Sequence, residues 1–154
     1  MRKLEAVTLI TDGACIGNPG PGGWAVLMRH GEQVSELYGS EPHTTNNRME
    51  LTAVIQGLAA LKEPRKVTIV TDSEYVQKGI THWMARWKRT GWQTAERQPV
   101  KNQDLWKALD AALARHRASW QWVKGHGVHA DNIRVDKLAN SAARLQINDT
   151  AVGA

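Results

Sequence analysis

Two short runs rich in β-branched residues, 7–11 and 67–71, each lead directly into an aspartate. Such runs are typical of strands, so each strand is expected to deliver one carboxylate at its end. Two further acids lie in segments with helical periodicity, and the full set is Asp12, Glu50, Asp72 and Asp136. Four carboxylates in one place repel one another unless cations neutralise them, and hard oxygen ligands favour magnesium or manganese. The pattern therefore predicts a divalent-cation site.

Each of these acids also has an ordinary structural interpretation. Asp72 could cap the helix that follows it, and Glu50 could lie in a first helical turn, where negative charge is favourable. Asp136 could pair with Lys137 or Arg144 on an exposed helix face. Taken singly, no acid identifies a functional site; the four do so only if the fold gathers them.

The composition is that of one globular domain with a basic surface. The chain has 154 residues, of which 42% are hydrophobic and 23% charged. Lys and Arg total 20 against 15 Asp and Glu, a net charge of +5, and the surface outside an acidic site is more basic still. A basic surface beside an acidic metal site suits a polyanionic substrate, although composition alone leaves open a basic protein without one.

The sequence also indicates where the protein works. No apolar run approaches the roughly 20 residues that cross a bilayer, and the first residues lack the apolar stretch of a signal peptide. The single cysteine, Cys15, excludes an internal disulfide and fits a reducing compartment. We therefore expect a cytoplasmic protein with no membrane partner, and a monomer with no protein partner is the simplest assembly.

The order of the elements predicts an α/β fold with a five-stranded mixed sheet flanked by helices. The expected strands are 4–12, 24–29, 33–38, 66–71 and 120–123, with a turn-rich link at 16–23 and a loop at 125–130. Helices are expected between 44–47 and Pro64, over 73–90 with a break near Gly79, over 103–116 and over 132–145. Residues 1–147 would form the domain, and 148–154 a flexible tail.

Five local motifs carry a resemblance to a known family. In chain order they occupy residues 11–23, 44–50, 71–73, 122–126 and 132–136. Together they resemble type 1 ribonuclease H in its bacterial form, which has a basic protrusion, and their order and spacing match from residue 7 to about residue 145. Five motifs in register are far more specific than one.

The resemblance implies a ribonuclease H-like fold and an endonuclease that hydrolyses the RNA strand of RNA/DNA hybrids. The products would carry 5′-phosphate and 3′-hydroxyl ends, and two Mg²⁺ ions, with Mn²⁺ as a substitute, would act with the substrate. By resemblance Asp12 bridges both ions, Glu50 and Asp72 complete one site, and Asp136 helps hold the ion on the nucleophile side. His126 occupies the position of an auxiliary histidine that passes protons or helps product leave.

The resemblance also assigns residues to the hybrid, which a protein distinguishes from duplex DNA by its 2′-hydroxyls and shape. Three asparagines would line the minor groove, two residues would face the RNA sugars, and one would bind a DNA phosphate. These are Asn18, Asn46 and Asn47, then Cys15 and Glu74, then Thr45. The structural alternative for Asn46 is a helix N-cap, and both roles are compatible.

Residues 82–101 alternate tryptophans with cations and resemble the basic protrusion that grips the hybrid. The residues concerned are Trp83, Arg86, Trp87, Lys88, Arg89, Trp92 and Lys101. Basic residues with interleaved aromatics suit backbone contact and stacking, whereas the alternative is that the tryptophans pack into the core. Three other tryptophans, Trp106, Trp120 and Trp122, are expected to be core residues because the chain has no Phe.

Three positions depart from the family pattern. Ile133 stands where relatives usually have Glu, Glu74 where some have Gln, and Val128 where Gly is frequent. None removes one of the four acids, so activity is expected to survive. The alternatives are another nuclease of the same fold, or a hybrid-binding module without cleavage, for which four repelling carboxylates would have no purpose.

Overall fold

The computed structural model describes the backbone of residues 6–124 and 130–153, and their side chains up to residue 147. A single sheet contains the strands β1 (Ala6–Cys15), β2 (Gly20–His30), β3 (Gln33–Thr44), β4 (Lys66–Thr71) and β5 (Arg117–Trp122). The strand order is β3-β2-β1-β4-β5; β1 pairs antiparallel with β2 and parallel with β4. The predicted five-stranded mixed sheet is therefore confirmed.

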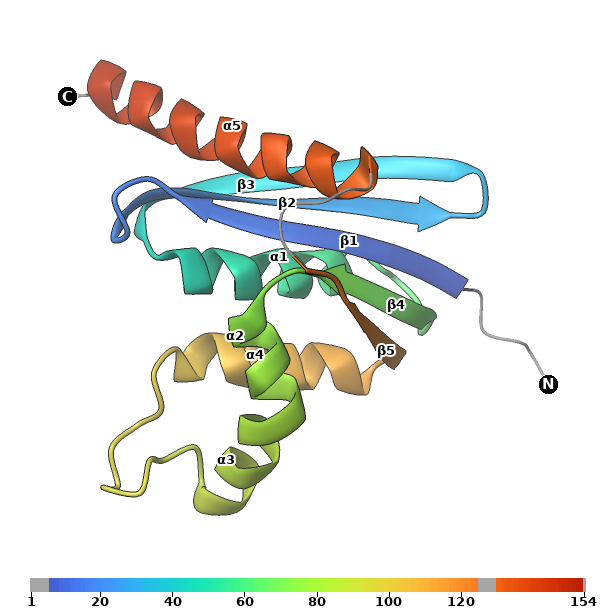
Figure 1. Ribbon diagram of the computed structural model, residues 1–154, viewed down its shortest axis with the longest axis vertical. Coiled ribbons are helices and arrows are strands. Elements are labelled where there is room, and N and C mark those ends of the chain that lie inside the picture. The colour runs from blue at the N-terminus through green and yellow to red at the C-terminus, as the bar shows by residue number, and fades with distance from the viewer. Residues whose placement is uncertain (1–5, 125–129, 154) are drawn as a thin grey trace.

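Helices cover both faces of this sheet (Figure 1). They are α1 (Asn46–Ala59), α2 (Glu74–Lys78), the π-helical η1 (Gly79–Trp83), α3 (Met84–Thr90), α4 (Gln103–Ala114) and α5 (Ala130–Gly153). Neighbouring residues of β1 serve opposite faces: Leu9 packs in the core with α1 and α4, whereas Ile10 packs against Val135 and Ala139 of α5. This period of two is what a strand buried on both sides requires.

The turn-rich link was predicted too long at its C-terminal end. β2 already begins at Gly20, and Gly22 and Gly23 are strand residues that pair with β1. A Cβ atom on Gly23 would lie 2.2 Å from the carbonyl oxygen of Ala139 in α5. This glycine therefore allows a helix to approach the sheet closely, a role that sequence alone did not distinguish from turn formation.

The break predicted near Gly79 is confirmed as a change of helix geometry. The helical segment changes from α to π geometry at this residue and returns to α geometry at Met84. A Cβ atom on Gly79 would lie 1.9 Å from a ring atom of Trp106, which is fully buried as predicted. The indole of Trp106 thus occupies the space that any larger residue would need.

Several other boundaries differ from those predicted. β3 continues to Thr44, β5 spans Arg117–Trp122, and α5 begins within the predicted loop and runs to Gly153 instead of ending at residue 145. The flexible tail and the domain boundary at 147 stay predictions. None of the helices in the described residues is both long and apolar enough to span a membrane.

Candidate active site

The parallel pairing of β1 with β4 brings two carboxylates together. The last paired residues are Ile10 and Val70, and each strand has its aspartate two residues farther on, at Asp12 and Asp72. Adjacent strands lie about 4.8 Å apart, so the register alone places both side chains at one edge of the sheet. Asp72 directly follows β4, as predicted, but the expected end of the first strand at Asp12 is wrong: β1 continues to Cys15, and Asp12 lies within it, paired with Ala25 of β2.

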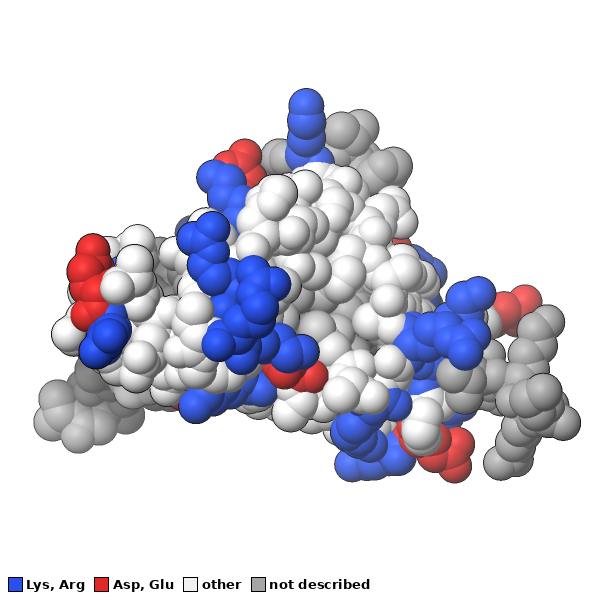
Figure 2. Space-filling view, turned by 90° about the horizontal axis from the view of Figure 1, so that it is seen from below, with Lys and Arg blue, Asp and Glu red and all other residues white. Residues whose placement is uncertain are grey.

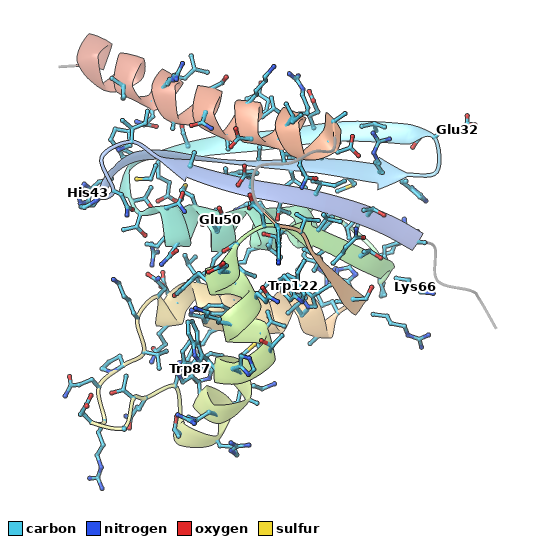
Figure 3. The ribbon with its side chains drawn as sticks, viewed as in Figure 1. Glu32, His43, Glu50, Lys66, Trp87 and Trp122 are labelled. Carbon is cyan, nitrogen blue, oxygen red and sulfur yellow. The ribbon has the colours of Figure 1, made fainter. Side chains whose placement is uncertain are left out.

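Helix α1 supplies the third carboxylate. It can cross close to β1 because Gly13 has no side chain: a Cβ atom there would lie 2.5 Å from the backbone nitrogen of Glu50. Carboxylate oxygens of Asp12, Glu50 and Asp72 all lie within 4.8 Å of one another. Figure 3 shows Glu50 between α1 and β1, at the level where α2 begins.

Burial gives this cluster unusual proton affinities. Asp12 and Glu50 are only 5% and 6% exposed. Loss of hydration raises the pKa of Asp12 to about 8, and the neighbouring Asp72 and Asp136 add to the shift. The pKa of Glu50 is likewise raised well above its ordinary value, first by burial and then by the charges of Asp12 and Asp72. The cluster thus resists carrying its full negative charge unaided.

Asp136 approaches the cluster from the other face of the sheet, on α5. Its carboxyl group is close enough to Asp12 to raise the pKa of that residue. Asn140, one turn farther along α5, donates from Nδ2 to the Asp136 carbonyl oxygen at 2.9 Å and to Oδ1 at 3.3 Å. Asp136 therefore lies beside the group of three and adds to the electrostatic repulsion on Asp12.

Two of the ordinary structural interpretations of the acids are wrong. The N-cap of α2 is Ser73, whose Oγ accepts a hydrogen bond from Val76 N at 3.1 Å, so Asp72 is not the cap. Glu50 is not in the first turn of α1, which contains no acidic residue. Asp72 is therefore not needed to cap α2, and Glu50 is not needed in the first turn of α1.

The cluster has the properties of a divalent-cation site. Its donors are hard carboxylate oxygens, which Mg²⁺ and Mn²⁺ prefer. Glu50 Oε2 is buried, and among the described residues it has no hydrogen-bond partner, so one oxygen is left for a cation. A bound cation would also offset the repulsion that raises the pKa of Asp12. The residues present therefore fit a divalent metal.

The residues assigned to the hybrid by resemblance border this cluster. Cys15, Asn46, Asp136 and Asn140 help to line a hollow of about 320 Å³. The backbone N–H of Asn46 donates to Asn18 Oδ1 at 2.8 Å, which joins two of the three predicted asparagines.

The N-cap of α1 lies within the predicted stretch 44–47, but it is not Asn46. The N-cap is Thr45, whose Oγ1 accepts from Arg48 N at 3.2 Å, so the cap expected at Asn46 is one residue earlier. The backbone of Asn46 is instead held by the asparagine of the β1–β2 link. Asn47, the third of the predicted asparagines, is the next residue along α1 and is half-buried.

A second hollow, of about 520 Å³, is lined in part by Asp72. Glu74 helps to line it, together with Gln77, Lys124 and the half-buried Trp122. Sequence reasoning singled out neither Gln77 nor Lys124, and it also missed Asn140 in the first hollow. The available signal was spacing, because Gln77 and Asn140 lie one helical turn after residues that it did single out.

The predicted basic segment combines packed rings with exposed cations. The Trp87 ring lies 5.7 Å from Trp83, 6.3 Å from Trp92 and 5.4 Å from the buried Trp106, measured between centroids. All three segment tryptophans are half-buried, so the alternative of core packing is met at least in part. Figure 3 shows Trp87 on α3, away from the sheet.

The cations of this segment point outward. Arg86, Arg89 and Lys101 are exposed, whereas Lys88 forms an ion pair with Asp110 at 3.2 Å. From the side of α2, α3 and α4, Lys and Arg side chains outnumber acidic ones on the visible face (Figure 2). His126 and Val128 lie outside the described residues, and their predicted roles stay predictions.

A mixed sheet that brings Asp12 and Asp72 together from two parallel strands, with Asp12 and Glu50 buried, lies beside a basic face. This is the arrangement of a metal-dependent enzyme that acts on a polyanion. The family model of RNase H matches residues 4–144. A Ribonuclease H of Solibacter usitatus is 62% identical over 143 residues, covering 93% of this chain and 98% of the relative. A Ribonuclease HI of Neisseria meningitidis is 61% identical over 139 residues, covering 90% of this chain and 96% of the relative.

A solved structure shows that the similarity holds for the three-dimensional fold as well. LC9-RNase H1, described as a type 1 RNase H with the type 2 active-site motif, superposes with a TM-score of 0.85 at 33% identity. The match covers 95% of this chain and 75% of that chain. The chain belongs to the RNase H family, in its bacterial type 1 form. It is a hydrolase, an endonuclease for the RNA strand of RNA/DNA hybrids.

Proposed function

We propose that cleavage takes place at the carboxylate cluster and depends on two Mg²⁺ ions, with Mn²⁺ as a substitute. The residues that would hold them are Asp12, Glu50, Asp72 and Asp136. The observation that carries the proposal is the convergence of three carboxylates within 4.8 Å in a buried setting. When bound, the ions supply positive charge that activates a water molecule and stabilises the leaving 3′ oxygen.

The chain's own residues have distinct tasks in this reaction. Asp12 would help to hold both cations, because its carboxylate lies within 4.8 Å of those of Glu50 and Asp72, and Asp136 is close enough to raise its pKa. Glu50 and Asp72 would complete one cation site, and Asp136 would help to hold the cation that activates the attacking water. His126 exchanges protons near the scissile phosphate or assists product release, since imidazole titrates near neutrality.

The hybrid is bound along the hollows and the basic segment beside the cluster. Asn18, Asn46 and Asn47 contact the minor groove, where an amide can both donate and accept hydrogen bonds. Cys15 and Glu74 face the RNA sugars from the two hollows, one of which is lined by Asp136 and the other by Asp72.

The DNA strand and the outer part of the hybrid are held elsewhere. Thr45 contacts a DNA phosphate from the start of α1. The exposed cations Arg86, Arg89 and Lys101 bind backbone phosphates, while Lys88 reaches them only by exchanging its ion pair with Asp110. Trp83, Trp87 and Trp92 present their half-exposed rings to the nucleic acid. This segment corresponds to the basic protrusion, and its charge supports the assignment.

We further propose that the protein acts as a monomer in the cytoplasm. The single cysteine supports a reducing compartment. Residues 1–147 are proposed as the catalytic domain, and 148–154 as a flexible tail.

One gel experiment tests the proposed function. Labelled RNA/DNA hybrid, duplex RNA and duplex DNA are incubated with and without Mg²⁺, and with the Asp12→Asn variant. We expect cleavage of the hybrid alone, only with Mg²⁺, and nearly none by the variant. Glu32→Gln, an exposed acid at the β2–β3 turn labelled in Figure 3, is the matched control and should cut normally. Normal turnover by Asp12→Asn would refute the metal assignment.

A further inference from the structure

A hydrogen-bond network joins three helices beside the carboxylate cluster. Tyr75 lies in the first turn of α2, and its hydroxyl oxygen accepts from Asn102 Nδ2 at 3.0 Å and from Trp106 Nε1 at 2.9 Å. Asn102 Oδ1 accepts from Arg48 Nη1 at 3.2 Å, and Arg48 lies in α1 two residues before Glu50. The network therefore connects α1 and α2, which flank the cluster, with the start of α4.

Arg48 and Asn102 are themselves firmly held. The guanidinium of Arg48 donates to both carboxylate oxygens of Asp104, at 3.0 and 2.8 Å, a bidentate pair of fixed geometry. Asn102 has a left-handed backbone with φ of 60°, which Asn tolerates better than most residues. The loop that returns from the basic segment is thus anchored at one defined residue.

The aromatic ring of Tyr75 begins a series of ring contacts that leads into the basic segment. Its centroid lies 5.8 Å from Trp83 and 5.4 Å from Trp106. Trp87 then contacts Trp83, Trp106 and Trp92, the last of which lies in the loop after α3. Tyr75 therefore contacts the basic segment through its ring and the start of α4 through its hydroxyl.

We propose that Tyr75 is a positioning residue, whose hydroxyl fixes the basic tryptophan segment relative to the carboxylates at the cleavage site. Tyr75 lies three residues after Asp72. If its hydroxyl loses its hydrogen bonds, the basic tryptophan segment, and the hybrid bound to it, shifts with respect to the carboxylates. Small displacements of bound substrate reduce productive binding strongly. The inference rests on the proposed role of this segment in holding the hybrid.

The test is a double-mutant cycle. Tyr75→Phe keeps the ring and removes only the hydroxyl group, while Arg86→Gln with Arg89→Gln neutralises two exposed cations. We expect Tyr75→Phe to raise KM for the hybrid roughly threefold to tenfold with kcat within about twofold. If the hydroxyl positions the cations, neutralising them must raise KM less, and flatten the salt dependence less, in the Tyr75→Phe background than in the natural protein.

The outcomes separate the two proposals. Independent, multiplicative effects on KM would overturn the positioning role while leaving phosphate binding by the segment intact. No effect of the neutralised arginines on KM or salt dependence would overturn both. Tyr38→Phe, on the edge strand β3 and 60% exposed, is the matched control and should leave both parameters unchanged. All measurements are made at a temperature where each variant is fully folded.

A second variant covers the case in which Tyr75→Phe does not fold. Asn102→Gly retains access to the left-handed backbone and removes the amide that contacts Arg48 and Tyr75. The same rise in KM and the same reduced effect of the neutralised arginines are expected. An unchanged KM in Asn102→Gly would overturn the proposal.

Discussion

Removing the charge of Asp12 should stabilise the metal-free protein while abolishing its activity. The pKa of Asp12 is about 8 in the folded state against an ordinary value of 3.8, mainly because the carboxyl is buried. The folded state therefore holds this proton more tightly than the unfolded chain. Its contribution to stability is fully present below pH 3.8 and is lost as the pH rises towards 8.

The size of the effect follows from the same shift. Each pKa unit corresponds to about 1.4 kcal/mol, so ionisation costs up to about 4 kcal/mol at pH 7 relative to pH 4. Relaxation and water entry reduce this cost, and we expect about 2 to 4 kcal/mol. Asp12→Asn carries no such charge, so its advantage over the natural protein should be small near pH 4 and grow up to pH 8.

The assay is urea unfolding in EDTA at several pH values between 4 and 8, followed by circular dichroism. Excess Mg²⁺ should then stabilise the natural protein and affect Asp12→Asn much less, because ligand binding to the folded state adds to its stability. A variant that is no more stable than the natural protein at pH 7, with the same dependence on pH, would refute the reasoning.

The control is an acid with the opposite shift. The bidentate hydrogen bonds from Arg48 lower the pKa of Asp104, which is largely exposed. Its contribution to stability is therefore present above its ordinary pKa and is lost in acid. Asp104→Asn should be slightly less stable than the natural protein at pH 7, and this difference should vanish as the pH falls. The two substitutions thus change the free energy of unfolding at pH 7 in opposite directions and by different amounts.

Three further predictions concern other parts of the molecule. Gly79→Ala should destabilise the fold by about 2 kcal/mol or more, measured by thermal unfolding, because its Cβ would overlap the Trp106 ring; an unchanged melting temperature would contradict this packing. Neutralising the three cations of α3 should raise KM and leave kcat nearly unchanged. The slope of log affinity against log salt concentration should fall by about one per lost phosphate contact, and an unchanged slope would contradict phosphate binding by this segment. His126→Ala should lower kcat by about 10²-fold without abolishing turnover, and full activity would dismiss the auxiliary role.

The carboxylate cluster could be predicted from sequence because its signals are local. A strand run that ends in an acid is visible in residues 7–12 and again in 67–72, and the parallel register then aligns both ends. The approach of Glu50, by contrast, depends on a contact between distant residues, since Gly13 has no Cβ atom to collide with the backbone of α1 at Glu50. The mixed sheet could be predicted from runs and turns short enough to interpret individually.

Other features depend on residues that are distant in the chain. The glycines at 22 and 23 were interpreted as part of a turn because their actual neighbours, Ala139 in α5 and Thr44 in β3, lie in elements whose packing no local pattern encodes. The pairing of Lys88 with Asp110 is of the same kind, since it requires α3 to lie beside α4. Residues such as Gln77 and Lys124 have a defined place only once a hollow forms next to Asp72.

The sequence by itself determined which residues carry negative charge, which strands deliver them and which segment is basic, because composition and periodicity are properties of short stretches. Only the tertiary structure decided how deeply Asp12 is buried, and hence why its pKa rises to about 8. It alone also decided that Tyr75 meets both Asn102 and the ring series. The physical reason is that desolvation and side-chain contacts depend on all neighbouring atoms, most of which come from distant parts of the chain.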